Sequence, residues 1–233
     1  MNILDYHALL PELLLAATVL AVLVVDLLPV RKQWTAVVAL VGLFAAFVPL
    51  LTLGFCESLS FCDETAARTM FDGSYVVDTF SIVLKGLFLG SAFVAVLISA
   101  GYLERGRFWE GEYYFLMMAS VLGAVVMTSS RGLVTIFVAL ELVTGPTFAL
   151  AGWRKGNARS NEAALKFFIV GVLSASILLF GYALPVHMIT AIDNRTWTHA
   201  IPRLAMRTLP VVLGLALICA LGGVALMLAS TSG

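Results

Sequence analysis

Seven stretches of mostly apolar residues dominate this sequence, and each is long enough to cross a lipid bilayer as a helix, which takes about 17–25 residues. They run approximately over residues 8–28, 34–54, 79–102, 113–129, 132–151, 162–184 and 209–230. Scattered glycines within them are typical of helices that approach closely in lipid. We therefore predict an all-α fold: a polytopic transmembrane helix bundle of about seven helices, forming a single domain over residues 1–233.

The composition supports a membrane protein that contacts lipid. Hydrophobic residues make up 61% of the chain and charged residues only 12%, which is too apolar for a soluble domain. The net charge is zero and no long basic or acidic run occurs, so a nucleic-acid partner is not expected. The first apolar stretch lacks a basic leader and a following cleavage site, and is interpreted as a retained span.

Two connections between the predicted helices are longer than the others, at about residues 55–78 and 185–208. Lys and Arg are more numerous on the opposite face, which holds Arg154, Lys155 and Arg159 and is therefore predicted to be the inner one. This places both longer loops outside. The first of them contains Cys56 and Cys62, which could either form a disulfide or remain two free thiols.

Charged residues within the apolar stretches are the candidates for function. Asp26 lies near the end of its stretch, where an interfacial position explains it. Lys85 lies deeper, seven residues after Asp78. Its long side chain could reach the interface, so a functional role and a snorkelling position are both open.

Glu141 is the charged residue that most needs an explanation. It stands in the middle of "FVALELVTGP", near the predicted bilayer midplane, and a carboxylate cannot reach the interface from there. An ionisable group at that depth costs on the order of 2.5–3.5 kcal/mol. A protonated carboxyl that only bonds a neighbouring helix is one reading, and a proton-carrying group is the other.

The residues that follow favour the proton-carrying reading. Thr144 lies three residues after Glu141 and shares its helix face. Pro146 has no amide hydrogen, so the carbonyl of Leu142 loses its helical partner. Irregular backbone at membrane depth is tolerated only where protein or a water-filled cavity satisfies it. The combination indicates a hydrated path beside Glu141.

Lys166 supplies a second charge on the next predicted helix. It follows Glu162 by four residues, so a surface ion pair is one reading. A proton relay with Glu141 is the other, because changing one charge shifts the proton affinity of a nearby one.

The run "SSRGLVTIFVALELVTGPTFALAGWRKGNARSNEAALKFFIVGVLSAS" resembles subunit N of respiratory NADH:quinone oxidoreductase (complex I), the mitochondrial NADH dehydrogenase subunit 2 family. The earlier "LLPELLLAATVLAVLVVDLL" and "VVDTFSIVLKGLF" resemble the first and third spans of that subunit. The resemblance covers about residues 8–184, the amino-terminal half of an antiporter-like fold. It matches Glu141 and Lys166 to two intramembrane charges of the family.

The resemblance implies a membrane-arm subunit that moves protons while the enzyme complex transfers electrons from NADH to quinone. It implies a bacterial or mitochondrial inner membrane, other membrane-arm subunits as partners, and no flavin, iron–sulfur cluster, quinone or metal held by this chain. The composition agrees, since three cysteines at scattered spacings cannot supply a four-cysteine cluster. We expect Glu141, Lys166 and Lys85 to form the proton relay, supported by Thr144 and Pro146.

The chain also departs from the family pattern. Family members have about fourteen helices and usually carry a lysine on the seventh, whereas residues 209–230 contain none. One expectation is a split proton-translocating subunit whose carboxyl-terminal helices are supplied by a separate chain. The alternatives are a reduced, non-pumping structural subunit of the same membrane arm and a subunit of a related cation/proton antiporter.

Overall fold

The computed structural model describes residues 7–28, 33–58, 68–71, 73–106, 110–154 and 156–191. The chain divides into two compact units, Met1–Leu150 and Ala151–Gly233. The single domain expected from the sequence stays a prediction. Within the described residues, six helices are long and apolar enough to cross a membrane, which confirms the helical membrane fold. The seventh predicted span, at about 209–230, lies outside the described residues.

The first unit contains five of these helices and a short hairpin. The elements are α2 (Leu10–Leu27), α3 (Gln33–Ser58), β1 (Arg68–Met70), β2 (Tyr75–Val77), α4 (Thr79–Gly106), α5 (Glu110–Ser129) and α6 (Leu133–Ala151). Each helix lies within a few residues of its predicted span. The hairpin was not predicted, because its strands are only three residues long and were interpreted as part of a loop.

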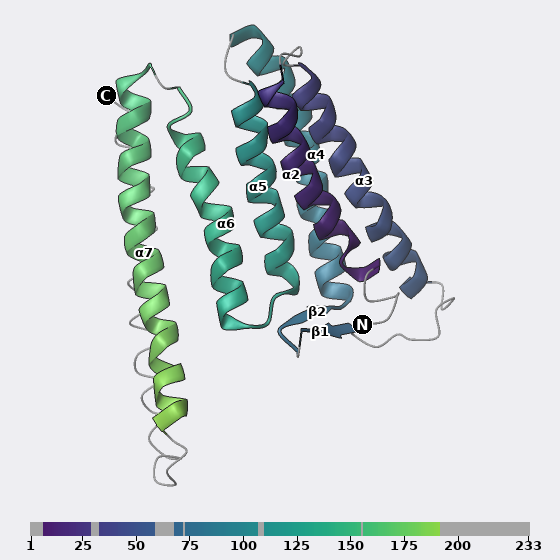
Figure 1. The fold of residues 1–233 in the computed structure, drawn as a ribbon, viewed down its shortest axis with the longest axis vertical. Coiled ribbons are helices and arrows are strands. Elements are labelled where there is room, and N and C mark those ends of the chain that lie inside the picture. The colour runs from purple at the N-terminus through teal and green to yellow at the C-terminus, as the bar shows by residue number, and fades with distance from the viewer. Residues whose placement is uncertain are drawn as a thin grey trace. The chain divides into compact units, whose positions relative to one another are not determined.

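Helices α2, α3, α4 and α5 pack together as a bundle (Figure 1). Small residues permit close contacts between them: a Cβ at Gly42 of α3 would overlap the side chain of Thr18 of α2. The core consists of apolar side chains from all four helices, including Leu15, Val22, Leu43, Leu50, Leu89, Val96, Met118 and Val125.

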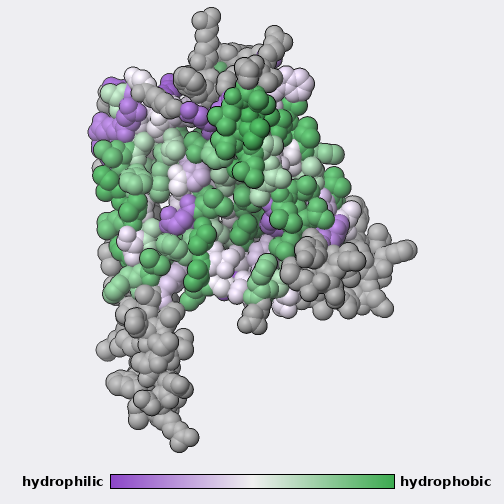
Figure 2. All heavy atoms as spheres, in the orientation of Figure 1, coloured by the Kyte–Doolittle hydropathy of each residue, from purple (hydrophilic) through white to green (hydrophobic). Residues whose placement is uncertain are grey.

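Hydrophobic side chains dominate the face of the molecule that Figure 2 shows. Large apolar residues such as Leu20, Phe44, Val83 and Ile98 are more than 60% exposed on these helices. In a soluble protein a surface of this kind would be an aggregation liability, whereas in a bilayer it meets lipid tails.

The hairpin closes the end of the bundle at which α2 and α4 begin (Figure 1). Its turn holds Phe71 at φ 52° and Gly73 at φ 82°, and glycine suits such a conformation. The carbonyl of Ser74 accepts hydrogen bonds from the amides of Arg131 (2.8 Å) and Gly132 (3.2 Å), in the connection between α5 and α6. The hairpin is therefore tied to the loop that precedes α6.

The second unit contains α7 (Ala158–Ala191). Asn157 precedes this helix, and its side-chain oxygen accepts a hydrogen bond from the amide of Arg159 at 3.0 Å, as a capping residue does. The helix continues seven residues beyond the predicted end at 184, so the second long connection begins later than the predicted 185.

Candidate functional site

Lys85 is buried in the helix bundle. Asp78 caps α4, because its carboxylate accepts a hydrogen bond from the amide of Ser81 and its own amide donates to the Ser81 hydroxyl, both at 2.9 Å. The helix then carries Lys85 about 9 Å from its first residue at the usual rise per residue. There the side chain is only 1% exposed. The sequence left a functional role and a snorkelling position open for Lys85, and both stay predictions.

Glu12 is the partner of Lys85. The Nζ atom of Lys85 lies 2.6 Å from Oε1 of Glu12, and both side chains are buried. Glu12 stands in the first turn of α2, directly after Pro11, where proline and an acidic residue both suit a helix start. Because α2 and α4 both begin at the hairpin end of the bundle, this pair joins the first turn of α2 to the second turn of α4.

Tyr75 of the hairpin completes the cluster. Its hydroxyl donates a hydrogen bond to Oε1 of Glu12 at 2.6 Å and accepts one from Nζ of Lys85 at 3.4 Å. The lysine also lies 5.4 Å from the centre of the Tyr75 ring, within cation–π range. Burial, together with the neighbouring carboxylate, raises the pKa of Tyr75 well above its usual value. The phenol therefore stays protonated and acts as a donor.

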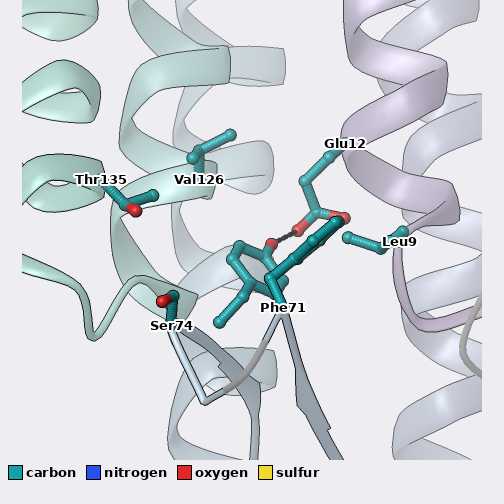
Figure 3. Close-up of a pocket in the computed structure, with 7 residues that line it drawn as sticks. Leu9, Glu12, Phe71, Ser74, Val126 and Thr135 are labelled. Atoms are coloured by element: carbon teal, nitrogen blue, oxygen red, sulfur yellow. Dashed lines mark hydrogen bonds between the residues drawn. The ribbon is translucent and has the colours of Figure 1, made fainter.

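The other carboxylate oxygen of Glu12 is buried and has no hydrogen-bond partner among the described residues. Glu12 is also one of the residues that line a hollow of about 340 Å³. Figure 3 shows Glu12 pointing from α2 toward the hairpin and this hollow. Its lining comes from the helix starts, the hairpin and the end of α5: Leu9, Glu12, Phe71, Ser74, Tyr75, Val126 and Thr135.

The sequence analysis did not single out Glu12. One signal could have found it: alternate spans run in the same direction, so the first turns of the first and third spans must lie at the same face of the membrane. A buried lysine near the start of one span requires a counter-charge, and Glu12 is the acidic residue at the start of the other.

Glu141 lies in the middle of α6, about 12 Å from its first residue at the usual helical rise. The side chain is half-buried. In the part of the chain that the structure describes, its carboxyl group makes no hydrogen bond or ion pair with Lys85, which belongs to the cluster at the hairpin. The expected relay role of Glu141 stays a prediction.

Thr144 and Pro146 both lie within a continuous α6. The hydroxyl of Thr144 donates to the carbonyl of Leu140 at 3.0 Å rather than to Glu141's carboxylate. Pro146 leaves the Leu142 carbonyl without its usual helical partner. The next carbonyl, that of Val143, accepts a hydrogen bond from the Ser120 hydroxyl of α5 at 3.2 Å. Side-chain hydroxyls thus supply hydrogen bonds around the proline, as expected for helices in membranes. The hydrated path stays a prediction.

Gly123 allows α6 to approach α5 at this level. A Cβ at Gly123 would lie 2.8 Å from the amide nitrogen of Val143 and 3.0 Å from the carbonyl oxygen of Ala139. Both atoms belong to the α6 backbone and cannot rotate away. The helix segment that carries Glu141 is therefore held against α5 through a glycine.

Lys166 belongs to the second unit and forms an ion pair within α7. Its Nζ atom lies 2.6 Å from Oε1 of Glu162, one turn earlier, and the two side chains are 40% and 60% exposed. This ion pair is the surface pair that was one of the two interpretations of Lys166 from the sequence. The other interpretation, a role in the relay, stays a prediction. Cys62 and the side chain of Cys56 lie outside the described residues. Within them, no group of three His, Cys, Asp or Glu residues could hold a metal ion.

Comparison with known proteins identifies the family. NADH-quinone oxidoreductase subunit N 2 of Streptomyces griseus is 41% identical over 179 residues, which is 76% of this chain and 33% of that protein. NAD(P)H-quinone oxidoreductase subunit 2 of Synechococcus elongatus is 34% identical over 95% of this chain and 41% of its own length. The chain belongs to the subunit N family of NADH:quinone oxidoreductase.

Two further comparisons agree with the subunit N family. The family model described as NADH:quinone oxidoreductase/Mrp antiporter, TM matches residues 130–229, a range that includes Glu141 and Lys166. Respiratory complex I from Thermus thermophilus contains a chain that is 30% identical, with a TM-score of 0.58 over 75% of this chain and 36% of that one. This chain thus spans between about a third and two fifths of the length of the two curated relatives.

Proposed function

We propose that this chain is an antiporter-like membrane-arm subunit of a complex I-type NADH:quinone oxidoreductase and contributes to proton translocation. The observation that carries the proposal is the similarity to subunit N over 76% of the chain, in a protein that carries Glu141 near the middle of the long apolar helix α6. The proposed location is a bacterial or mitochondrial inner membrane.

The proposal assigns proton transfer to this chain and electron transfer to other subunits. Glu141 would take up and release protons within the membrane, with Thr144 and Pro146 shaping the path beside it, and Lys166 would tune its charge. Three cysteines are too few for a four-cysteine cluster, so the proposal includes no redox cofactor in this chain. The partners are other membrane-arm subunits, and a separate chain with further carboxyl-terminal helices stays a prediction.

A second candidate is a structural subunit of the same membrane arm that does not pump. It is favoured by the Lys166–Glu162 pair, which gives the lysine a partner inside its own helix. The absence of lysine from residues 209–230 favours it too. The two candidates differ in whether a neutral side chain at Glu141 changes proton flux.

Purification of the full chain in mild detergent tests the assembly part of the proposal. The proposal predicts that other complex I-type subunits copurify with it and that the material oxidises NADH with a quinone as acceptor. Purification of the chain by itself, or with subunits of a cation/proton antiporter and without NADH oxidation, would contradict it.

A further inference from the structure

Ser120 differs from other hydroxyl residues of the helices in where its hydrogen bond goes. The hydroxyls of Ser91, Ser99 and Thr128 donate to carbonyls three residues earlier in their own helices, at 2.9, 2.9 and 2.7 Å. This is a usual arrangement for serine and threonine within a helix. Ser120 of α5 instead donates to the carbonyl of Val143 in α6, at 3.2 Å. The bond therefore links two helices.

Gly123 brings the α6 backbone against the same face of α5. It follows Ser120 by three residues, so the two positions lie one above the other on the helix surface. A Cβ at Gly123 would lie 2.8 Å from the amide nitrogen of Val143 and 3.0 Å from the carbonyl oxygen of Ala139. These two residues stand on either side of Glu141 in the sequence. Helix α5 therefore contacts the α6 backbone at the level of Glu141.

This contact lies on the side of α6 that faces away from the Glu141 side chain. Ala139, whose backbone meets Gly123, is 2% exposed, whereas Val134 and Val138 are 76% and 59% exposed. Two residues turn a helix by about 200°, so Glu141 projects from nearly the opposite side of α6 to Ala139. Helix α5 thus acts on Glu141 through the α6 backbone and not by contact with its carboxyl group.

Pro146 explains why this stretch of α6 gains from an external support. Proline has no amide hydrogen and removes the hydrogen bond to the carbonyl of Leu142, which makes it a common place for a helix to bend. A bend or rotation of α6 at this point changes the direction in which the Glu141 carboxyl points. The hydrogen bond from Ser120 holds the turn that precedes the proline, through Val143.

We propose that Ser120 is a positioning residue for Glu141. Together with Gly123 it holds the α6 backbone against α5 and so fixes the direction of the carboxyl, away from α5. The inference rests on the proposed proton translocation, in which Glu141 takes up and releases protons, and it adds the residue that keeps that group in place. A proton passes only between groups within hydrogen-bond reach, so a small rotation of α6 is enough to slow its transfer.

Two substitutions of Ser120 test the role of its hydroxyl. Ser120→Ala removes the hydrogen bond to α6, and Ser120→Thr keeps a hydroxyl. The additional methyl of threonine has room, because Ser120 lines a hollow of about 320 Å³ between α4 and α5. Both variants should assemble, since a single hydrogen bond between membrane helices usually contributes little to stability. Failure of Ser120→Ala to assemble would assign the hydroxyl to assembly and overturn the proposal.

Proton flux per assembled complex, driven by NADH oxidation in reconstituted vesicles, is the measurement. We expect Ser120→Ala to lower it by about tenfold, within the roughly hundredfold loss that a misplacement of about 1 Å can cause. Ser120→Thr should recover most of the flux. Ser91→Ala is the matched control, because Ser91 lines the same hollow from α4 and its hydroxyl donates within its own helix. It should pump at the wild-type rate. Equal flux in Ser120→Ala and Ser120→Thr would overturn the proposal.

A double variant separates positioning from general damage. If Ser120 acts through Glu141, loss of its hydroxyl has no further effect once the carboxyl is gone, so Ser120→Ala with Glu141→Gln should match Glu141→Gln alone. A further loss in the double variant would overturn the proposal. Wild-type flux in Ser120→Ala beside a reduced flux in Glu141→Gln would overturn it too and leave the proposed function standing. Wild-type flux in Glu141→Gln would instead overturn the proposed function and this inference with it.

Discussion

Lys85 of α4 and Glu12 of α2 form an ion pair of 2.6 Å inside the helix bundle, under a hairpin that supplies Tyr75 as a third member. In hydrocarbon, a lone lysine at this depth would be costly, and the pair with its hydrogen bonds offsets that cost. The cluster joins the first turn of α2 and the second turn of α4 to the hairpin between the spans.

Tyr75 gives the stability of the protein a characteristic dependence on alkaline pH. Its pKa is raised from the usual 10.0, first by burial and then by Glu12. The folded protein therefore keeps a proton that the unfolded chain loses, so the stabilising contribution is complete below about pH 10 and declines as the pH rises further. We expect thermal stability above pH 10 to fall less steeply with pH in Tyr75→Phe than in the wild type. Parallel slopes in melting experiments would contradict this assignment.

Gly123 is predicted to be intolerant of even a methyl group. Alanine usually stabilises a helix relative to glycine by about 0.5–1 kcal/mol. At Gly123, however, the new Cβ would lie 2.8 Å from a backbone atom of α6. We expect Gly123→Ala to destabilise the protein by about 1–3 kcal/mol through overpacking.

The matched control for Gly123 is Gly90 of α4, where an added Cβ would meet nothing within 4 Å. Gly90→Ala should leave the melting temperature unchanged or raise it. Equal effects of the two substitutions would mean that α5 and α6 do not meet at Gly123.

The helices could be predicted from the sequence, whereas the cluster could not. An apolar stretch long enough to cross a membrane is expected to form a helix there, because its backbone groups must be hydrogen-bonded internally. The first six predicted spans match helices within a few residues, apart from longer ends. The hairpin was missed because Tyr75–Val77 is too short for a periodic pattern. Glu12 was missed because one acidic residue in a first helical turn is ordinary, and only the tertiary contact with Lys85 makes it special.

The candidate relay residues show the same limit. The positions of Glu141, Thr144 and Pro146 within one helix followed from hydropathy and were predicted correctly. The hydrogen bonds around these residues depend on neighbours that are distant in the sequence, such as the hydroxyl of Ser120. Lys166 has a partner four residues away, and local spacing alone indicated that pair.

Lys166 can be tested by breaking its ion pair from either side. If the lysine charge matters for proton transfer, Lys166→Gln should lower proton flux by about tenfold or more. Glu162→Gln, which breaks the same exposed pair, should have little effect, since surface pairs contribute only about 0–1 kcal/mol. Equal flux in both variants would assign Lys166 to the surface of α7 and favour the structural candidate.

Proton flux in vesicles that contain the Glu141→Gln assembly tests the proposed function most directly. The substitution keeps the size of the side chain and removes its ability to carry a proton, and Glu162→Gln provides the same chemical change at an exposed position. If the account holds, Glu141→Gln assembles normally and its NADH-driven proton flux falls about tenfold or more, whereas Glu162→Gln pumps at the wild-type rate. Wild-type flux in an intact Glu141→Gln assembly would contradict the account and leave the chain a structural subunit.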